Sequence, residues 1–446
     1  MSKQRIQLSD HFTYSRLLRF VLPCIGTMLF TSIYGIVDGL CVSNFVGKTA
    51  FAAVNLIMPL PMLLGTIGFM LGTGGSAIVG ITLGEGDQKK ADRYFTLFLL
   101  AALISVSVLA VLGIVFLRPI AVLLGAKGEL LDYAVRYGRI LMVSLPTFAL
   151  QNMFQSFFVT AEKPHLGFWF TVGAGCTNMV LDVLMVGIWG WGVEGAAIAT
   201  FISQLVGGVL PVFYFIDRSN SSRLHLCKTS FYSKVLRDAC INGSSELMTN
   251  LSMSLVNILY NYQLLRLAGE NGVAAYGVIM YAAFLFVAVF VGYAVGSAPI
   301  VSFHYGARNH AEVHNLYRKS LRLIAVVAVT LTLASMFIIP CVARIFVGYD
   351  AELLALTSRA FRLYALSFLI MGFNVYASSF FTALGDGVTS ALISFLRTLA
   401  FQVIAILLLP LLLGIDGIWL AAELAALAVS AAMLLTKDKV FHYRKA

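Results

Sequence analysis

The stretch Thr171–Gly187, TVGAGCTNMVLDVLMVG, decides how the chain is interpreted. It is apolar and has a helical pattern, yet it carries Asn178 and Asp182, which lie four residues apart and so on one face of a helix. A carboxylate inside a lipid-embedded segment costs about 2.5–3.5 kcal/mol on insertion scales. The stretch therefore predicts a membrane-embedded helix whose acid serves a function.

The composition of the whole chain agrees with a membrane location. Of its 446 residues, 59% are hydrophobic and 12% are charged, whereas soluble domains average about 25% charged residues. Apolar runs that reach the ~20 residues of a membrane-spanning helix recur from end to end. We therefore predict an all-α polytopic membrane protein. A transmembrane β-barrel is excluded, because its strands alternate over short segments.

The apolar runs predict twelve spans, which divide into two halves of six. The first run is too long for the apolar part of a signal peptide, so we expect no cleaved signal. We predict an N-terminal six-helix lobe over 1–216, a basic linker over 217–238 and a C-terminal six-helix lobe over 239–446. The predicted spans are 17–42, 52–80, 94–116, 133–159, 165–187, 193–216, 239–265, 274–299, 320–343, 359–383, 389–413 and 416–436.

The positions of Lys and Arg predict the orientation. If the N-terminus is inside, most basic residues fall in segments on the cytoplasmic side, as the positive-inside rule requires. Both termini are then cytoplasmic. The net charge of +10 is explained by these loops, so we predict no nucleic-acid partner. The six cysteines have neither metal-ligand spacing nor a disulfide pattern.

The two halves repeat at an offset of 222 residues. Because each half has an even number of spans, the repeats are parallel, an arrangement found in secondary transporters. The second half lacks these polar residues, because the positions equivalent to Asp38, Asn178 and Asp182 are Tyr260, Ala400 and Ile404. The matched landmarks are the turns 84–87 and 306–309, Gly74 with Gly296, Asn152 with Asn374, and Gly195 with Gly417.

The first span carries a polar stripe that ends at an acid. Thr27, Thr31, Tyr34 and Asp38 are spaced 4, 3 and 4 residues apart, which places them on one helix face. Asp38 and Asp182 both lie near the outer ends of their spans, so they can share a depth. We interpret them as a proton or cation site; the alternative is structural acids bonded to neighbouring hydroxyls. Asp38, Asn178 and Asp182 could exchange a proton or bind Na⁺, and the residues do not choose between the two.

A second polar stripe lies in the seventh span, nearer the cytoplasm. It comprises Glu246, Asn250, Asn257 and Asn261, and Arg397 lies at a similar depth. Glu246 and Arg397 are either a static ion pair or two charges that contact substrate. A substrate cavity could also include Tyr34, Tyr276 and Met280, although such residues more often serve plain helix packing.

Several motifs are absent from the sequence. There is no G-x-x-x-x-G-K-[ST] phosphate-binding loop, which argues against an ATP-driven motor on this chain. There is also no H-E-x-x-H or G-x-S-x-G motif. We therefore predict a protein that is not an enzyme and needs no cofactor beyond a coupling ion.

Six stretches, taken in order, resemble the multidrug and toxic compound extrusion (MATE) family, in its branch of bacterial multidrug exporters. The stretches are IYGIVDGLCVSNFVG (33–47), GTGGSAIVGITLGEGDQKKA (72–91), TNMVLDVLMVGIWGWGVEGAAIATFISQ (177–204), PIVSFHYGARN (299–309), ALGDGVTSALISFLR (383–397) and GIDGIWLA (414–421). The resemblance implies two six-helix lobes that form a V and alternate between outward- and inward-facing states.

The resemblance also implies roles for particular residues. Asp38 fits the helix-1 acid of the family, and Asn178 and Asp182 fit its helix-5 pair. Asn152 and Thr200 fall where polar partners of that site are expected, and Glu246 and Arg397 resemble a helix-7 acid and a common arginine. Two departures are the turn TAEKP (160–164), which replaces a glycine-aspartate turn and is expected to affect a loop, and the unexpected Glu423.

The leading hypothesis is an H⁺- or Na⁺-coupled antiporter that exports organic, often cationic, compounds across a bacterial plasma membrane, as a monomer embedded in the lipid bilayer. One alternative is a flippase for lipids or lipid-linked glycans, which predicts a more cationic cleft and often additional spans. Another is a channel or a receptor that does not transport. The repeat and the paired acids argue against the channel and the receptor.

Overall fold

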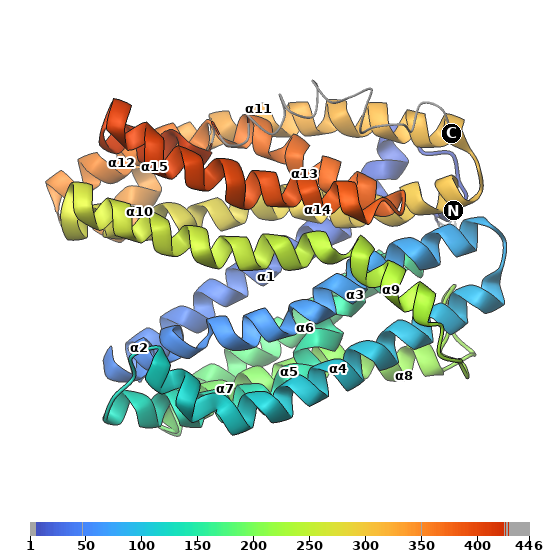
Figure 1. The fold of residues 1–446 in the computed structure, drawn as a ribbon, viewed down its shortest axis with the longest axis horizontal. Helices are drawn as coiled ribbons and strands as arrows, with labels where there is room; N and C mark the ends of the chain where they lie inside the picture. Colours follow the sequence, from blue (N-terminus) through green and yellow to red (C-terminus); the bar gives the residue numbers. More distant parts are fainter. Residues whose placement is uncertain (1–5, 47, 349, 423, 425–426, 428–446) are drawn as a thin grey trace.

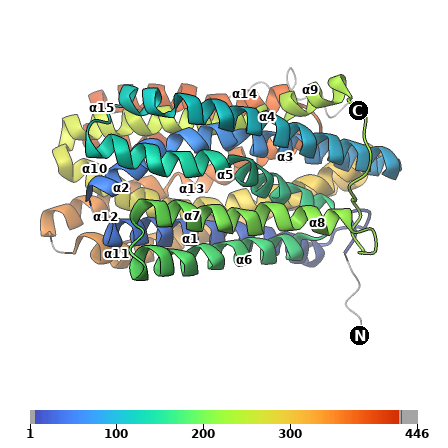
Figure 2. The same ribbon diagram turned by 90° about the horizontal axis from the view of Figure 1, so that it is seen from below.

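The computed structural model describes residues 6–46, 48–348, 350–422, 424 and 427, and the regular structure in these residues is helical. The helices form two bundles that converge at the end carrying the N-terminus and diverge towards the other end (Figure 1). Seen after a 90° turn, they run roughly along the long axis of the molecule (Figure 2). We call the converging end the closed end and the other the open end.

The first bundle is built from the N-terminal half, and its helix α1 crosses the space between the bundles (Figure 1). Its elements are α1 (Tyr14–Phe45), α2 (Lys48–Ile57), α3 (Pro59–Gly84), α4 (Gln88–Leu123), α5 (Glu129–Thr160), α6 (Pro164–Asp182), the π-helical turn η1 (Val183–Ile188), α7 (Gly192–Gln204), the π-helical turn η2 (Leu205–Val209) and α8 (Leu210–Ile216).

The second bundle follows the short helix α9, which lies at the closed end. The elements of the C-terminal half are α9 (Ser233–Asn242), α10 (Ser244–Gly306), α11 (His310–Val347), α12 (Ala351–Ala365), α13 (Phe368–Ala383), α14 (Gly387–Phe395), the π-helical turn η3 (Leu396–Ala400) and α15 (Phe401–Leu413). Helix α10 is 63 residues long and breaks at Gly269, whose φ of 60° and ψ of −150° are not helical. It therefore contains the predicted seventh and eighth spans.

The described helices follow the predicted spans in order. Eight helices among the described residues are long and apolar enough to cross a membrane, or nine if the bent pair α12 and α13 is one span. The second half of α10 and the less apolar α5, which has 32 residues, provide two more. The twelfth predicted span, 416–436, lies mostly outside the described residues, and so does Glu423.

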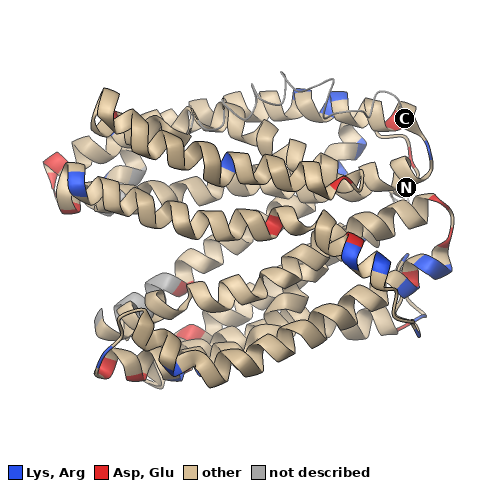
Figure 3. Ribbon diagram, viewed as in Figure 1, with Lys and Arg blue, Asp and Glu red and all other residues tan. Residues whose placement is uncertain are grey.

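Charged residues gather at the ends of the helices and are sparse along their middles (Figure 3). This distribution is expected of helices that cross a bilayer, because a charge in the hydrocarbon region is expensive. The few acidic and basic residues in the middle of the bundles therefore need an explanation of their own.

The repeated turns of the two halves are built in the same way. In the first half, the Asp87 carboxylate accepts the backbone N–H of Lys90 at 3.0 Å and caps α4. In the second half, Asn309 accepts the N–H of Glu312 at 3.1 Å and caps α11. The sequence repeat at these positions therefore reflects a tight turn followed by a helix N-cap.

Glycines bring the two bundles into backbone contact at the closed end. A Cβ atom on Gly84 of α3 would lie 2.0 Å from the carbonyl oxygen of Phe303, and one on Gly306 of α10 would lie 2.0 Å from that of Ile81. Gly84 and Gly306 are equivalent in the repeat, and so are Ile81 and Phe303. The contact is thus reciprocal, and any larger residue at either glycine would separate α3 from α10.

The turn between α5 and α6 has a larger role than the sequence predicts. Glu162, in the departing TAEKP turn, adopts a φ of 60°, a conformation that favours glycine. Its buried carboxylate accepts the backbone N–H of Leu8 at 2.9 Å and contacts Arg223 at 2.5 Å. The departure therefore changes how the N-terminal segment and the linker are held, not only the shape of a loop.

Candidate functional site

The predicted acids Asp38 and Asp182 come together where α1 packs against α6. The approach depends on Gly175, one turn before Asn178, because a Cβ atom there would lie 2.5 Å from the ring of Phe30 and 3.0 Å from that of Tyr34. Asp182 is the last residue of α6 and is followed directly by the π-helical turn η1. Such turns occur frequently at functional sites.

The two carboxyl groups lie close enough to share a hydrogen bond when one of them is protonated. Both carboxyl oxygens of Asp182 and both polar side-chain atoms of Asn178 are buried without a hydrogen-bond partner among the described residues. Two carboxylates at this separation repel each other when both are charged. The arrangement can therefore hold a proton or a small cation that the two acids share.

Tyr137 of α5 is a residue of this site that the sequence does not indicate. It is 1% exposed, and its hydroxyl group is close enough to interact electrostatically with both Asp38 and Asp182. No stripe or spacing singles it out, because it lies in the charged first part of α5 between Arg136 and Gly138. Only the packing of α5 against its neighbours reveals it.

The predicted partners Thr200 and Asn152 have different outcomes. Helices α6 and α7 form a hairpin around residues 189–191, so Thr200 of α7 lies at a depth similar to that of Asp182. Asn152, however, is fifteen residues beyond Tyr137 on α5, which separates them by about 22 Å along the helix. Its backbone carbonyl oxygen lies near Gly72 at the contact of α5 with α3, and its side-chain Nδ2 is buried without a hydrogen-bond partner among the described residues. The role of Asn152 at the acid site stays a prediction.

The charged residues of the second bundle, Glu246 and Arg397, lie near each other. Glu246 is in the first turn of α10 and Arg397 is in η3, and the two interact electrostatically. Within the described residues, no ion pair of 4.0 Å or less joins them. The Nε atom of Arg397 is buried without a hydrogen-bond partner among the same residues. Glu246 and Arg397 therefore do not satisfy each other's charged groups through a direct contact.

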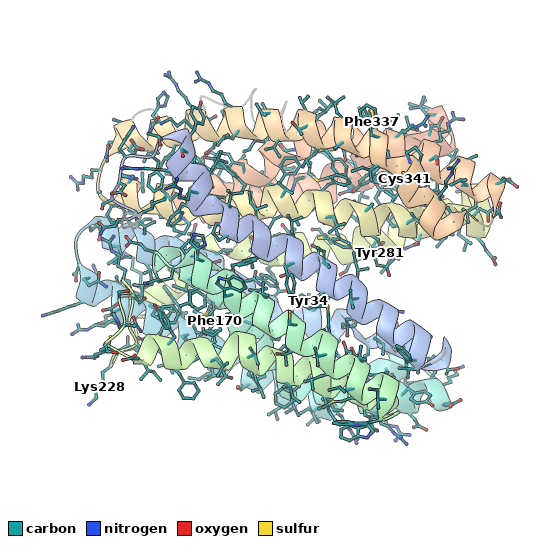
Figure 4. The ribbon with its side chains drawn as sticks, turned by 180° about the vertical axis from the view of Figure 1, so that it is seen from behind. Tyr34, Phe170, Lys228, Tyr281, Phe337 and Cys341 are labelled. Carbon is teal, nitrogen blue, oxygen red and sulfur yellow. The ribbon has the colours of Figure 1, made fainter. Side chains whose placement is uncertain are left out.

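The other residues predicted for a substrate cavity lie in several environments. Asn250 donates its amide to the Glu246 carbonyl at 2.9 Å, and Asn257 is exposed. Tyr276 is buried against Tyr260, with ring centroids 4.9 Å apart, and Met280 packs at the edge of the same core. Tyr34, one turn before Asp38, lies where α1 approaches α6 (Figure 4).

The second bundle has uncharged residues at the positions that correspond to the acid pair. Tyr260, which corresponds to Asp38, accepts a hydrogen bond from the Gln402 amide at 3.5 Å. This contact joins α10 to α15, whereas the Asp38 and Asp182 contact joins α1 to α6. The acid site is therefore a feature of the first bundle alone.

Comparisons with known proteins agree with the fold. A chain named multidrug export protein MepA, from Staphylococcus aureus, is 22% identical over 433 residues, which cover 96% of this chain and 95% of that protein. Two solved structures superpose with a TM-score of 0.92 over the full length of both chains. One is a MATE in complex with MaL6, at 23% identity, and the other is described as the outward-facing conformation of a multidrug resistance MATE family transporter, at 22% identity.

The model of the MatE family matches twice, at residues 23–184 and 247–408. Each match covers most of one bundle, so the repeat read from the sequence is the repeat of the family. The predicted resemblance, the all-helical polytopic fold and the assignment to transporters instead of enzymes are confirmed. The chain belongs to the MATE family of transporters.

Proposed function

We propose that this MATE family transporter exports organic, often cationic, compounds in exchange for H⁺ or Na⁺. The observation that carries the proposal is the pair of Asp38 and Asp182, which forms no ion pair with a basic side chain among the described residues. Both oxygens of Asp182 and one of Asp38 are buried without a hydrogen-bond partner there. Intramembrane acids of this kind mark ion pathways. The name of the staphylococcal relative, a multidrug export protein, supports drugs as the substrate class.

The two bundles would act as the moving parts. We take 1–216 and 239–446 as the two lobes and 217–238 as their connection. The closed end, which carries the N-terminus, would face the cytoplasm of the bacterium, in line with the positive-inside rule. An ion that binds Asp38, Asn178 and Asp182, with Thr200 at the same depth, would favour a different arrangement of α1 and α6 from the empty site, and would thereby oppose substrate binding.

Purified transporter in proteoliposomes tests this function and identifies the ion. The efflux of a cationic dye is measured under a pH gradient, a Na⁺ gradient, both gradients and neither. We expect one gradient to accelerate efflux and its collapse by an ionophore to stop it. Efflux that ignores both gradients would contradict antiport, and movement of a lipid-linked glycan in place of the dye would favour the flippase alternative.

Glu246 and Arg397 are proposed to contact substrate together. Because they interact without forming a direct ion pair, a zwitterionic compound could place its cationic group at Glu246 and its carboxylate at Arg397. The prediction is that Arg397→Gln weakens binding of the free-acid form of a rhodamine dye about tenfold, the scale of a lost hydrogen bond to a charged group. Binding of the methyl ester of the same dye, which has no carboxylate, should change little.

The measurement is dye fluorescence polarisation with the purified protein. Arg359→Gln is the matched control, because Arg359 is paired with Asp416 at the exposed surface. Glu246→Gln should weaken binding of both dyes, since each carries a cationic group. Equal losses for the acid and the ester in Arg397→Gln would instead indicate a static structural charge.

A further inference from the structure

The segment that precedes α1 is built into the closed end. Phe12 is fully buried, and its ring packs edge-on against Phe20 of α1 at 6.0 Å and His304 of α10 at 6.4 Å. Leu8 is also fully buried. A segment that buries two apolar side chains completely is a fixed part of the structure. The contacts that hold this segment therefore also hold the first turn of α1 in place.

The anchors of this segment lie on one face of α11, in the second bundle. Glu312 accepts the backbone N–H of Phe12 at 2.9 Å through Oε1, and its Oε2 lies 2.6 Å from Nδ1 of His11. Asn315 donates to Glu312 at 2.8 Å, and Lys319 donates to the Phe12 carbonyl at 2.6 Å. Residues 312, 315 and 319 follow helical spacing, so three side chains of one face hold His11 and Phe12, just before α1.

The remainder of α1 passes from the second bundle to the first (Figure 4). Near its start, Cys24 and Ile25 lie against Gly292 and Gly296 of α10. Further along, Phe30 and Tyr34 lie against Gly175 of α6, next to the acid pair. Helix α1 is therefore held by the second bundle at one end and carries Asp38 of the first bundle near its other end.

We propose that Glu312 is a positioning residue of the transport cycle, because it ties the start of α1 to the second bundle while Asp38 belongs to the ion site of the first. A rearrangement of α1 when the ion binds then pulls on α11 and is transmitted to the relative position of the bundles. Glu312 itself contacts neither ion nor substrate. The inference rests on the proposed function, since it assumes that ion exchange drives the change between states.

The experiment compares Glu312→Ala, Glu312→Gln and Glu352→Gln in the full chain. Glu352 is the matched control, because it occupies the first turn of α12 and is exposed. Spin labels at Lys89→Cys and Arg318→Cys, two exposed positions on α4 and α11 near the closed end, report the separation of the bundles in nanodiscs. Dye efflux is measured on the same variants in proteoliposomes.

We expect Glu312→Ala to populate longer label distances and to reduce gradient-driven efflux by about 5- to 150-fold, the usual range of coupling between sites. Glu312→Gln retains an acceptor for the Phe12 N–H and should lie between the wild type and Ala. Lys319→Met, which removes the bond to the Phe12 carbonyl, should shift the distances in the same direction but less. Glu352→Gln should match the wild type.

The result that overturns the inference is a Glu312→Ala protein whose folded fraction retains wild-type distances and wild-type efflux per molecule, even if less of it folds. That result would reduce Glu312 to a stabilising contact. Failure of the proposed function looks different: the wild type itself would show no gradient-driven efflux. The distances measured without a gradient would still report whether Glu312 holds the closed end together.

Discussion

Replacing Asp182 with Asn is expected to abolish gradient-driven efflux without unfolding the protein, and Asp38→Asn is expected to do the same. Asn has nearly the shape of Asp but can neither release a proton nor supply a negative charge to a cation. Apart from the hydrogen bond that it shares with Asp38 when one acid is protonated, Asp182 has no hydrogen-bond partner among the described residues. The amide of the substituted side chain can still donate to Asp38, so the substitution costs little stability there. We expect efflux under the active gradient to fall to the rate measured without a gradient.

Thermal stability separates this effect from misfolding. Removing an unpaired buried charge is neutral or stabilising, so the melting temperature of Asp182→Asn should equal or exceed that of the wild type. Asp87→Asn is the matched control, because Asp87 caps α4 and Asn309 performs the same task for α11. Undiminished gradient-driven efflux in both Asp38→Asn and Asp182→Asn would contradict the assignment of these acids as the ion site.

The second large effect is expected at the glycines of the closed end. In Gly306→Ala, the added methyl group would lie 2.0 Å from the carbonyl oxygen of Ile81, and a backbone carbonyl inside a helix cannot move aside cheaply. We expect α3 and α10 to separate, longer distances between labels at Lys89→Cys and Arg318→Cys, and loss of efflux. Gly84→Ala should have the same effect, because its Cβ would meet the carbonyl oxygen of Phe303.

Helix propensity cannot account for such a loss. Exchanging Gly for Ala inside a helix favours the helix by about 1 kcal/mol, so any defect must come from the contact between bundles. Gly277→Ala is the matched control in α10, where nothing lies within 4 Å of the added methyl group. If Gly306→Ala retains the wild-type distances and efflux, the bundles do not approach as closely during transport as they do in this structure.

Most of the fold could be predicted because its information is local. Apolar runs set the helices, and the turns 84–87 and 306–309 reveal the repeat through cap residues close in sequence. Asp38 and Asp182 could be predicted as site residues for the same reason, since an acid within an apolar run is recognised from the neighbouring residues alone. The shared depth of Asp38 and Asp182 follows from counting residues along two spans.

The sequence is silent where contacts between distant parts of the chain decide which side chains meet. Asn152 has the residue type of an ion ligand, but it lies fifteen residues from Tyr137 along α5, so residue type alone does not place it at the acids. Tyr137 has no distinguishing pattern, yet the packing of α5 directs it to both Asp38 and Asp182. Periodicity identifies the face on which a side chain lies, but it does not identify the helix that the face meets.

The sequence by itself determined that this is a helical membrane protein of two repeated halves, with the acids Asp38 and Asp182 in the first half and neutral residues at their repeat positions in the second. The tertiary structure alone decided which polar groups meet. The bonds from Glu162 to Leu8 and from Glu312 to Phe12 join residues 154 and 300 positions apart. Contacts at such separations leave no local pattern, because they depend on how the bundles converge at the closed end and on glycines that let their backbones touch.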